Sequence, residues 1–166
     1  MGMYTGLRFK GVIKEGYREA IKEFLEEGLE WDQVKSYYPQ LTPLTLMAGH
    51  SRADFIPYGS MQLLEWEEKN EYAKFGYSTP SEWLLSFNEQ TGVWTFQCSL
   101  KNYDSTIDYF LENVASKIIE EAIHIETLYE EDRYGTFYKL ENGELIRDEN
   151  KKIDYRPWED DTEYYY

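Results

Sequence analysis

The chain has 166 residues, of which 42% are apolar and 17% aromatic, and its formal net charge is −15 at pH 7. This length suits one domain with a full core, and so many apolar residues exclude a disordered polyampholyte. The charge disfavours direct binding to nucleic acid because an acidic surface repels the phosphate backbone, and no stretch is long and apolar enough to suggest a membrane span.

A strand followed by a helix is predicted at the start of the chain. Apolar and basic residues alternate at the beginning of residues 7–14, which is typical of a strand. The helix follows from about residue 17, because apolar residues recur on one of its faces, namely Tyr17, Ala20, Ile21, Phe24 and Leu25. Gly28 stands where a C-terminal helix cap belongs.

The next part of the chain is less regular, since prolines and glycines interrupt residues 39–59. Two short strands are predicted there, over residues 55–61 and 61–66. An acidic run beside Trp66 has no specific partner in the sequence and is interpreted as a solvated face; it consists of Glu65, Glu67, Glu68 and Glu71.

The clearest early hairpin signal begins at Glu82. Residues 83–87 alternate between apolar and polar, residues 88–92 have the composition of a turn, and residues 94–101 alternate again. Two adjacent, half-buried strands are therefore predicted. The only cysteine, Cys98, lies on the apolar side of the second strand, so we expect a buried thiol, no internal disulfide and a reducing cytoplasmic location.

A second helix is predicted from Asp104 or Ser105. Both residue types are good N-caps, and Ser105 with Asp108 forms a pair that resembles a capping box. The apolar stripe of this helix consists of Ile107, Phe110, Leu111, Val114 and Ile118.

Strands are predicted to follow the second helix. Alternation indicates a strand over residues 123–129 and another over 135–140. Asn142-Gly143 is a strong signal for a tight hairpin turn, after which residues 145–146 return as a strand. A short edge strand is expected at residues 153–155.

These elements predict an α+β fold, in which a mostly antiparallel sheet carries two amphipathic helices on one face. A ferredoxin-like or related α/β sandwich satisfies this order of elements. Residues 1–157 are expected to form a single α+β domain, and residues 158–166 an acidic and aromatic C-terminal tail.

The second half of the chain, over about residues 94–146, resembles the ferredoxin-like modules of small phage and plasmid proteins. The resemblance lies in the layout, from the strand at Trp94 through the helix to the run 124–131 and the strand at 135–138. It implies an origin in a mobile genetic element, where small acidic proteins often inhibit host defence enzymes.

One pattern suggests hydrolase chemistry. Residues 48–53 resemble the Gly-x-Ser-x-Gly nucleophile elbow, with Ser51 as the nucleophile and His124 as the base by chain order. Ala53 replaces the final glycine, and the flanking residues have the composition of a loop rather than of a strand leading into a helix. We interpret the segment as a polar loop and expect binding rather than catalysis.

A metal site is a second candidate chemistry. His124 and Glu126 lie two residues apart on a predicted strand, so they could share an ion with help from elsewhere. Glu130 on the same face is about 20 Å from His124 by the usual strand rise. Because no further histidine or cysteine accompanies them, we interpret these residues as the solvent face of a half-exposed strand. The chain also lacks a Gly-rich phosphate loop, and no cofactor is expected.

Most of the charge lies towards the C-terminus. Residues 104–166 hold 18 acids and 7 bases, whereas residues 1–50 hold 7 acids and 6 bases. Two segments there combine carboxylates with aromatic rings, a composition that suits contact with basic protein surfaces. The predicted partner-binding residues are Tyr129, Glu130, Glu131, Asp132, Tyr134, Trp158, Glu159, Asp160, Asp161, Glu163 and Tyr164.

We therefore predict a non-enzymatic, acidic protein-binding module that docks on a basic protein surface. Carboxylates spaced along a surface can copy the phosphates of DNA, so the hypothesis extends to a phage or mobile-element inhibitor of a nucleic-acid-handling protein, of the DNA-mimic or anti-CRISPR-like type. Two alternatives stay open. One is a small-ligand or nucleotide binder, or a minor hydrolase, with a pocket lined by Trp31, Trp66, Trp83 and Trp94. The other is a structural protein of a larger assembly.

Overall fold

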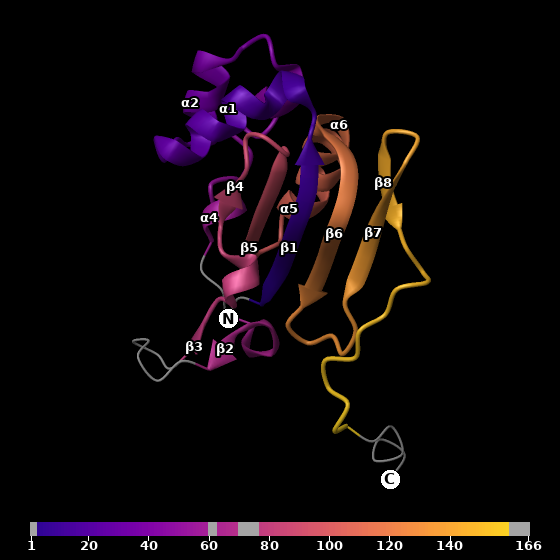
Figure 1. Ribbon diagram of the computed structural model, residues 1–166. Coiled ribbons are helices and arrows are strands. Elements are labelled where there is room, and N and C mark those ends of the chain that lie inside the picture. Colours follow the sequence, from indigo (N-terminus) through magenta and orange to yellow (C-terminus); the bar gives the residue numbers. More distant parts are fainter. Residues whose placement is uncertain (1–2, 60–62, 70–76, 160–166) are drawn as a thin grey trace.

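The computed structural model describes residues 3–59, 63–69 and 77–159. Its main element is a six-stranded sheet with the order β4-β5-β1-β6-β7-β8, in which each pair of neighbours is antiparallel. Helices pack on one face of the sheet (Figure 1). The predicted α+β class with a mostly antiparallel sheet is confirmed.

The centre of the sheet has the βαββαβ connectivity of ferredoxin-like folds. In chain order its elements are β1 (Tyr4–Ile13), α1 (Glu15–Glu26), β4 (Ser86–Phe87), β5 (Val93–Lys101), the continuous helical run α5 (Thr106–Tyr109), η3 (Phe110–Ala115) and α6 (Ser116–Ile118), and β6 (Ile119–Tyr129). Each helical connection passes over one intervening strand, β5 in the first case and β1 in the second. This unit therefore covers residues 4–129 and begins much earlier than the stretch 94–146 that the sequence layout indicates.

A hairpin extends the sheet beyond β6. It consists of β7 (Thr136–Glu141) and β8 (Glu144–Arg147). The turn predicted at Asn142-Gly143 is confirmed, because both residues have positive φ, 51° and 76°, as a tight hairpin of this type requires. The edge strand predicted at residues 153–155 is reduced to a single bridge between Tyr134 and Asp154.

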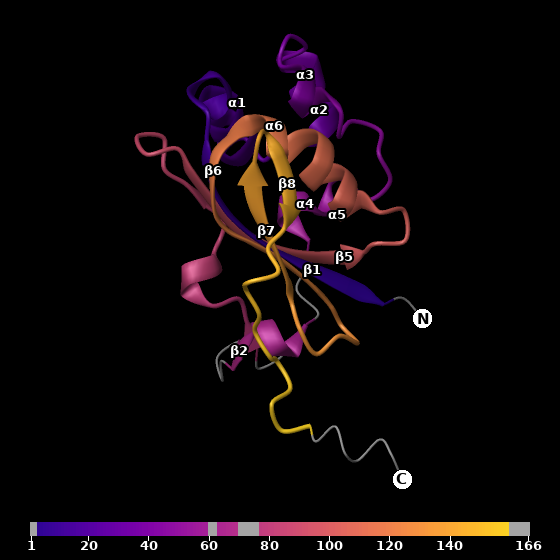
Figure 2. The same cartoon turned by 90° about the vertical axis from the view of Figure 1, so that its right-hand side faces the viewer.

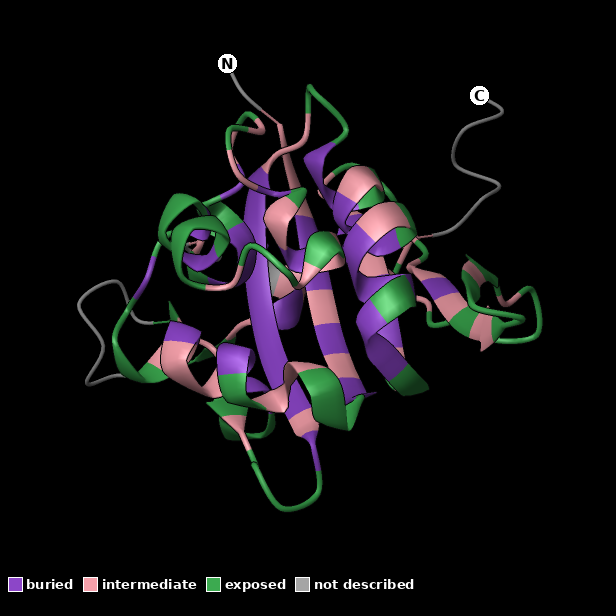
Figure 3. Cartoon of the chain, turned by 90° about the horizontal axis from the view of Figure 1, so that it is seen from above, coloured by how far each residue is buried: buried purple, intermediate pink, exposed green. Residues whose placement is uncertain are grey.

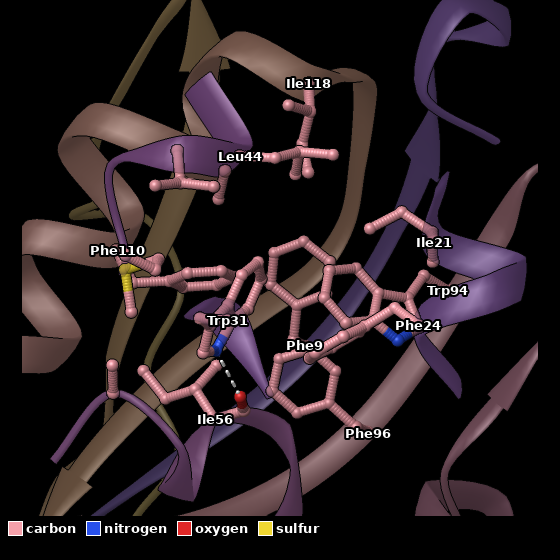
Figure 4. Close-up of a cluster of buried hydrophobic side chains, with 14 of the residues drawn as sticks. Phe9, Ile21, Phe24, Trp31, Leu44, Ile56, Trp94, Phe96, Phe110 and Ile118 are labelled. Carbon is pink, nitrogen blue, oxygen red and sulfur yellow. Dashed lines mark hydrogen bonds between the residues drawn. The ribbon is translucent and has the colours of Figure 1, made fainter. Parts of the chain in front are cut away.

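The helix-covered face carries the apolar core. Phe9 of β1 is opposite Phe96 of β5, and their ring centroids are 5.1 Å apart. Phe9 also meets Trp94 edge-on at 5.4 Å and Phe110 at 5.9 Å, so one ring joins two strands to the helical run. Figure 4 shows these rings packed together, with the Trp31 indole N–H donating to the Ile56 carbonyl at 2.8 Å.

The first helix ends as its sequence predicts. Gly28 has a φ of +61°, and the backbone N–H of Leu29 donates to the Phe24 carbonyl at 2.9 Å, which is the bond pattern of a Schellman cap. The inward face predicted for this helix is also confirmed, since Ala20, Ile21 and Phe24 are buried.

The second helix begins differently from its prediction. Ser105 adopts a left-handed conformation with a φ of 56° and its side chain makes no capping bond, so the capping box expected with Asp108 is wrong. Asn102 takes that role instead, because its Oδ1 accepts from the Ile107 N–H at 2.9 Å. The predicted apolar stripe is nevertheless buried throughout, at Ile107, Phe110, Leu111, Val114 and Ile118.

The long connection between α1 and β4 consists of short elements. They are α2 (Trp31–Tyr37), α3 (Thr42–Thr45), α4 (Phe55–Tyr58), η1 (Leu64–Trp66), the pair β2 (Glu68–Lys69) and β3 (Tyr77–Ser78), and η2 (Ser81–Trp83). The strands predicted at 55–61 and 61–66 are wrong for the residues described, which form α4 and η1. Pro57 lies inside α4, where it fixes φ and removes a backbone donor that a strand ladder would need.

The hairpin predicted from Glu82 forms only near its turn. Residues 81–83 are a helical turn, and β4 keeps two residues of the expected first strand. The prediction that β5 is half-buried is also wrong, because Thr95, Gln97 and Ser99 on its polar side are buried as well (Figure 3). Segments 63–66 and 81–83 lie over that side of the sheet, so both faces of its centre are covered.

The helices described are all too short or too polar to cross a membrane. The thiol of Cys98 is fully buried, as predicted, and burial raises its pKa above the usual value. The division of the chain at residue 158 stays a prediction.

Candidate protein-docking surface

The two acidic and aromatic segments that the sequence singles out lie side by side. The backbone N–H of Tyr155 donates to the Arg133 carbonyl at 2.9 Å, and Tyr134 forms a bridge with Asp154. The guanidinium of Arg133 donates two hydrogen bonds of 2.8 Å to the Asp154 carboxylate. We call residues 129–134 and 154–159 together the acidic edge.

Several carboxylates of the acidic edge have internal partners. Glu130 Oε1 accepts from the backbone N–H of Tyr4 at 2.5 Å, and Glu159 lies 3.7 Å from the Arg156 guanidinium. The bonds from Arg133 hold the pKa of Asp154 below its ordinary value. These carboxylates therefore position the chain rather than offer free charge to a partner.

Glu131 and Asp132 differ from these carboxylates. Both are exposed at the turn after β6, and neither forms an ion pair with any described residue. They are followed by Tyr134, whose ring is partly exposed. The turn thus offers two unneutralised carboxylates next to an aromatic ring.

Trp158 is the most exposed large apolar side chain described, at 73%. The segment leading to it is fastened by Arg156, whose guanidinium donates to the Glu130 carbonyl at 2.6 Å and lies 3.5 Å from Glu65. The ion pair with Glu65 places this segment beside η1, and Figure 2 shows it leading away from the sheet towards the C-terminus. Four other predicted partner-binding residues, Asp160, Asp161, Glu163 and Tyr164, lie outside the described residues.

A buried polar network lies behind the acidic edge. Glu126 of β6 is 0% exposed; its Oε2 accepts from the Tyr155 hydroxyl at 2.5 Å, and its Oε1 lies 2.9 Å from His124 Nε2. Gly135 packs directly against the carboxylate, leaving no room for a Cβ. The expectation that these two residues lie on a solvent face is therefore wrong for Glu126, which is buried beneath Tyr155. His124 stays partly exposed, with Trp83 and Phe137 packed against its ring.

Arg8 is the basic member of this network. Its guanidinium lies 4.7 Å from the Trp66 ring and 5.0 Å from the Trp83 ring, and it donates to Gln97 Oε1 at 2.7 Å. Burial lowers the pKa of Arg8, although the neighbouring Tyr155 and Glu126 oppose that change. Burial is the main cause that raises the pKa of Tyr155, and the hydrogen bond to Glu126 is the second. No distinct pattern in the sequence points to Arg8 or Tyr155, since a lone arginine in a strand normally faces water.

Ser51 and His124, the residues of the candidate hydrolase site, have separate surroundings in the fold. Ser51 lies in the turns between α3 and α4, where its carbonyl accepts from Thr106 and its hydroxyl meets Arg52 at 3.5 Å. The ring of His124 instead packs edge-on against Trp83 at 4.8 Å. A nucleophile elbow also requires a strand leading into the turn, and this loop follows the short helix α3.

Metal binding at His124 and Glu126 has no support within the described ranges. There, no group of three or more His, Cys, Asp or Glu side chains is arranged to hold an ion. The ring of Phe137 also packs against His124, with the two ring centroids 5.3 Å apart, and a phenyl ring cannot coordinate a metal. His124 and Glu126 therefore serve each other as hydrogen-bond partners.

The alternative pocket lined by tryptophans is not built from the residues proposed for it. Trp31, Trp66, Trp83 and Trp94 are at most 5% exposed. Trp31 and Trp94 fill the core, while Trp66 and Trp83 enclose Arg8. Their rings are engaged in packing, which leaves Trp158 as the accessible indole among the described residues.

Comparison with models of known protein families, with curated protein sequences and with solved structures finds no match to this chain. The function is therefore argued from the geometry.

Proposed function

We propose that the protein is a non-enzymatic binding module whose acidic edge docks onto a basic protein surface. The observation that carries the proposal is the position of Trp158. This side chain is 73% exposed, yet its segment is fastened to the domain through Arg156 and Tyr155. A large ring held at the surface loses little conformational freedom on binding, and tryptophans are frequent energetic anchors of interfaces.

The charges beside Trp158 define the chemistry of the partner. Glu131 and Asp132 have no described ion-pair partner, and the whole chain carries a net charge of −15. Unpaired surface carboxylates attract lysine and arginine side chains and accelerate association. Such attraction is screened by salt, since the Debye length falls to about 8 Å at physiological ionic strength.

The proposal includes a class of partner. Basic surfaces of this kind are typical of proteins that handle nucleic acids, so an inhibitor that occupies a DNA- or RNA-binding surface in the manner of a DNA mimic fits the acidic edge. The single cysteine is compatible with action in a reducing cytoplasm.

The test begins with capture of partners from a lysate of the source cells at low and high salt. The purified partner is then titrated into the protein while acrylamide quenches tryptophan fluorescence. Because four tryptophans are at most 5% exposed, the quenchable emission comes mainly from Trp158. A partner that docks on the acidic edge should be basic and should protect this emission.

Variants locate the contact. Trp158→Ala should weaken binding by about 30-fold, the equivalent of roughly 2 kcal/mol for an interface anchor. Glu131→Gln with Asp132→Asn should slow association and reduce its salt dependence. The matched control, Glu19→Gln on α1 with Glu27→Gln at its C-cap, removes equal charge elsewhere and should leave the affinity within about twofold.

Three results would overturn the proposal. They are binding that ignores both salt and the Trp158 substitution, equal losses in the two charge-pair variants, and capture of partners without basic surfaces. A stable homo-oligomer that buries Trp158, seen by light scattering, would favour an assembly protein instead.

A further inference from the structure

A small basic pocket adjoins the acidic edge. It has a volume of about 300 Å³ and lies between the start of β7 and the loop that follows β8. Arg147, Lys151 and Lys152 line it, together with Tyr134 and Phe137. Residues 104–166 hold only 7 bases against 18 acids, so three of those bases meet at one pocket in the most acidic part of the chain.

These three bases have few charged neighbours, although the charge of Lys152 contributes to lowering the pKa of Asp154. Arg147, Lys151 and Lys152 are exposed, and none of them forms an ion pair with a residue in the described ranges. The described contact of the Lys152 ammonium is with the Tyr134 ring, 4.0 Å from its centroid. Three cationic groups therefore remain available to a ligand.

The two acids of the pocket weaken this field only in part. Asp148 uses its carboxylate to accept the backbone N–H of Asn150 at 3.1 Å, and its own N–H donates to the Phe137 carbonyl at 2.8 Å. Glu149 is exposed to solvent. The lining as a whole has one more base than acid, in a protein whose net charge is −15.

The walls of the pocket are held in place. Tyr134 is bridged to Asp154, and Phe137 is buried against the ring of His124. The backbone of Gly135, which also lines the pocket, is pressed against the buried Glu126 carboxylate. A pre-formed floor with a rim of long, exposed basic side chains is suited to a small ligand, and the volume matches the lower limit of small-molecule sites.

We propose that this pocket binds a small phosphate-bearing anion. Arginine presents a planar fork that matches phosphate oxygens, and lysine adds mobile charge, so the three bases provide complementary donors. The site is separate from the docking surface, apart from the shared wall at Tyr134, and its ligand is chemically opposite to the basic partner proposed above.

Isothermal titration calorimetry tests the proposal with inorganic pyrophosphate, AMP and adenosine as probes. Pyrophosphate and AMP should bind the wild-type protein at millimolar concentration or below, and adenosine should not. Equal affinity for both anions identifies the phosphate group itself as the ligand, whereas tighter binding of AMP identifies a nucleotide. Absence of binding by both anions, or equal binding of adenosine, would overturn the proposal.

Two triple variants localise the binding. Replacing Arg147, Lys151 and Lys152 with glutamine should weaken anion binding by at least about tenfold, which is the loss expected from one charge-assisted contact.

The matched control replaces the exposed Lys14, Lys35 and Lys69 with glutamine and changes the net charge equally. It should bind within about twofold of wild type, since exposed charges far from the ligand are largely screened. Equal losses in both triples would show a general charge effect and sink the assignment. The pocket triple keeps Glu131, Asp132 and Trp158, so the two proposals fail independently.

Discussion

The two faces of the central strands are both buried, but by different means. On one face, Phe9 and Phe96 meet the helices in an apolar core. On the other, Arg8 and Glu126 are enclosed by aromatic rings from segments that have little regular structure. The first face depends on shape and apolar area, whereas the second depends also on hydrogen bonds and charge pairing. Substitutions should therefore act on the two faces through separate mechanisms.

The largest effect is expected on the apolar face. Phe9→Ala removes a fully buried ring that contacts Trp94, Phe96 and Phe110, so it leaves a cavity that the sheet cannot close. The free energy of unfolding should fall by about 3–5 kcal/mol in urea denaturation. Tyr37→Ala, at an exposed aromatic ring, should change it by less than about 0.5 kcal/mol. Similar losses for both would contradict the core assignment.

The second-largest loss of stability is expected from substitutions on the polar face of the sheet. Glu126→Ala removes the acceptor of the Tyr155 hydroxyl and the partner of His124, and it takes away one of the carboxylates that favour the charged form of the half-buried Arg8. We expect a loss of about 2–3 kcal/mol in the free energy of unfolding. Glu121→Ala on the exposed side of the same strand is the control, and it should be close to neutral. A neutral Glu126→Ala would mean that the network contributes no stability.

Packing against the carboxylate gives a smaller effect. A Cβ at Gly135 would overlap Glu126 Oε2, and the carboxylate cannot move aside freely because Tyr155 holds Oε2 and His124 holds Oε1. Gly135→Ala should lower the free energy of unfolding by about 1–3 kcal/mol, as overpacking does. Gly16→Ala in α1, where nothing lies near the new methyl group, should instead stabilise by up to about 1 kcal/mol. Thermal denaturation of both variants tests this expectation. Equal shifts in their melting temperatures would show that Gly135 does not pack closely against Glu126.

The smallest expected effect is a dependence on alkaline pH. The pKa of Tyr155 is raised above its ordinary value of 10.0, so above that pH the unfolded chain releases a proton that the folded protein retains. The contribution of Tyr155 to stability should be constant below about pH 10 and should then fall as the pH rises towards the folded pKa. Tyr155→Phe should reduce the slope measured by denaturation at each pH. Tyr38, whose pKa is raised to about 12 by its bond to Glu23, should contribute separately. An unchanged slope in Tyr155→Phe would place the titration elsewhere.

The contrast between the faces also explains which predictions succeed. The stripes of α1 and of the second helix, and the apolar side of β5, repeat with the period of their own element, so the sequence reveals them. Arg8, Trp66 and Trp83 meet across large sequence separations, and no local period indicates such contacts. The sequence predicts strands at η1 and η2 for the same reason. Trp66 and Trp83 are buried because they pack on the face of the sheet, and not because they belong to its strands.

The candidate site divides in the same way. Its composition can be predicted from the sequence, because residues 129–134 and the segment around Trp158 are both acidic and aromatic. Their adjacency depends on the Arg133–Asp154 pair and the Tyr155–Glu126 bond. The tertiary structure also distinguishes Glu130, which accepts from the Tyr4 N–H, from the exposed Glu131, which has no ion pair with a described residue.

Local period, turn chemistry and composition are enough to predict the α+β class, the inward faces of both helices, the Asn142-Gly143 turn and the acidic C-terminal region. They cannot show that the polar side of the sheet is covered around Arg8 and Glu126, or that three bases gather in one pocket of an acidic protein. Desolvation and charge pairing depend on which distant segments pack together, whereas sequence patterns report only on near neighbours.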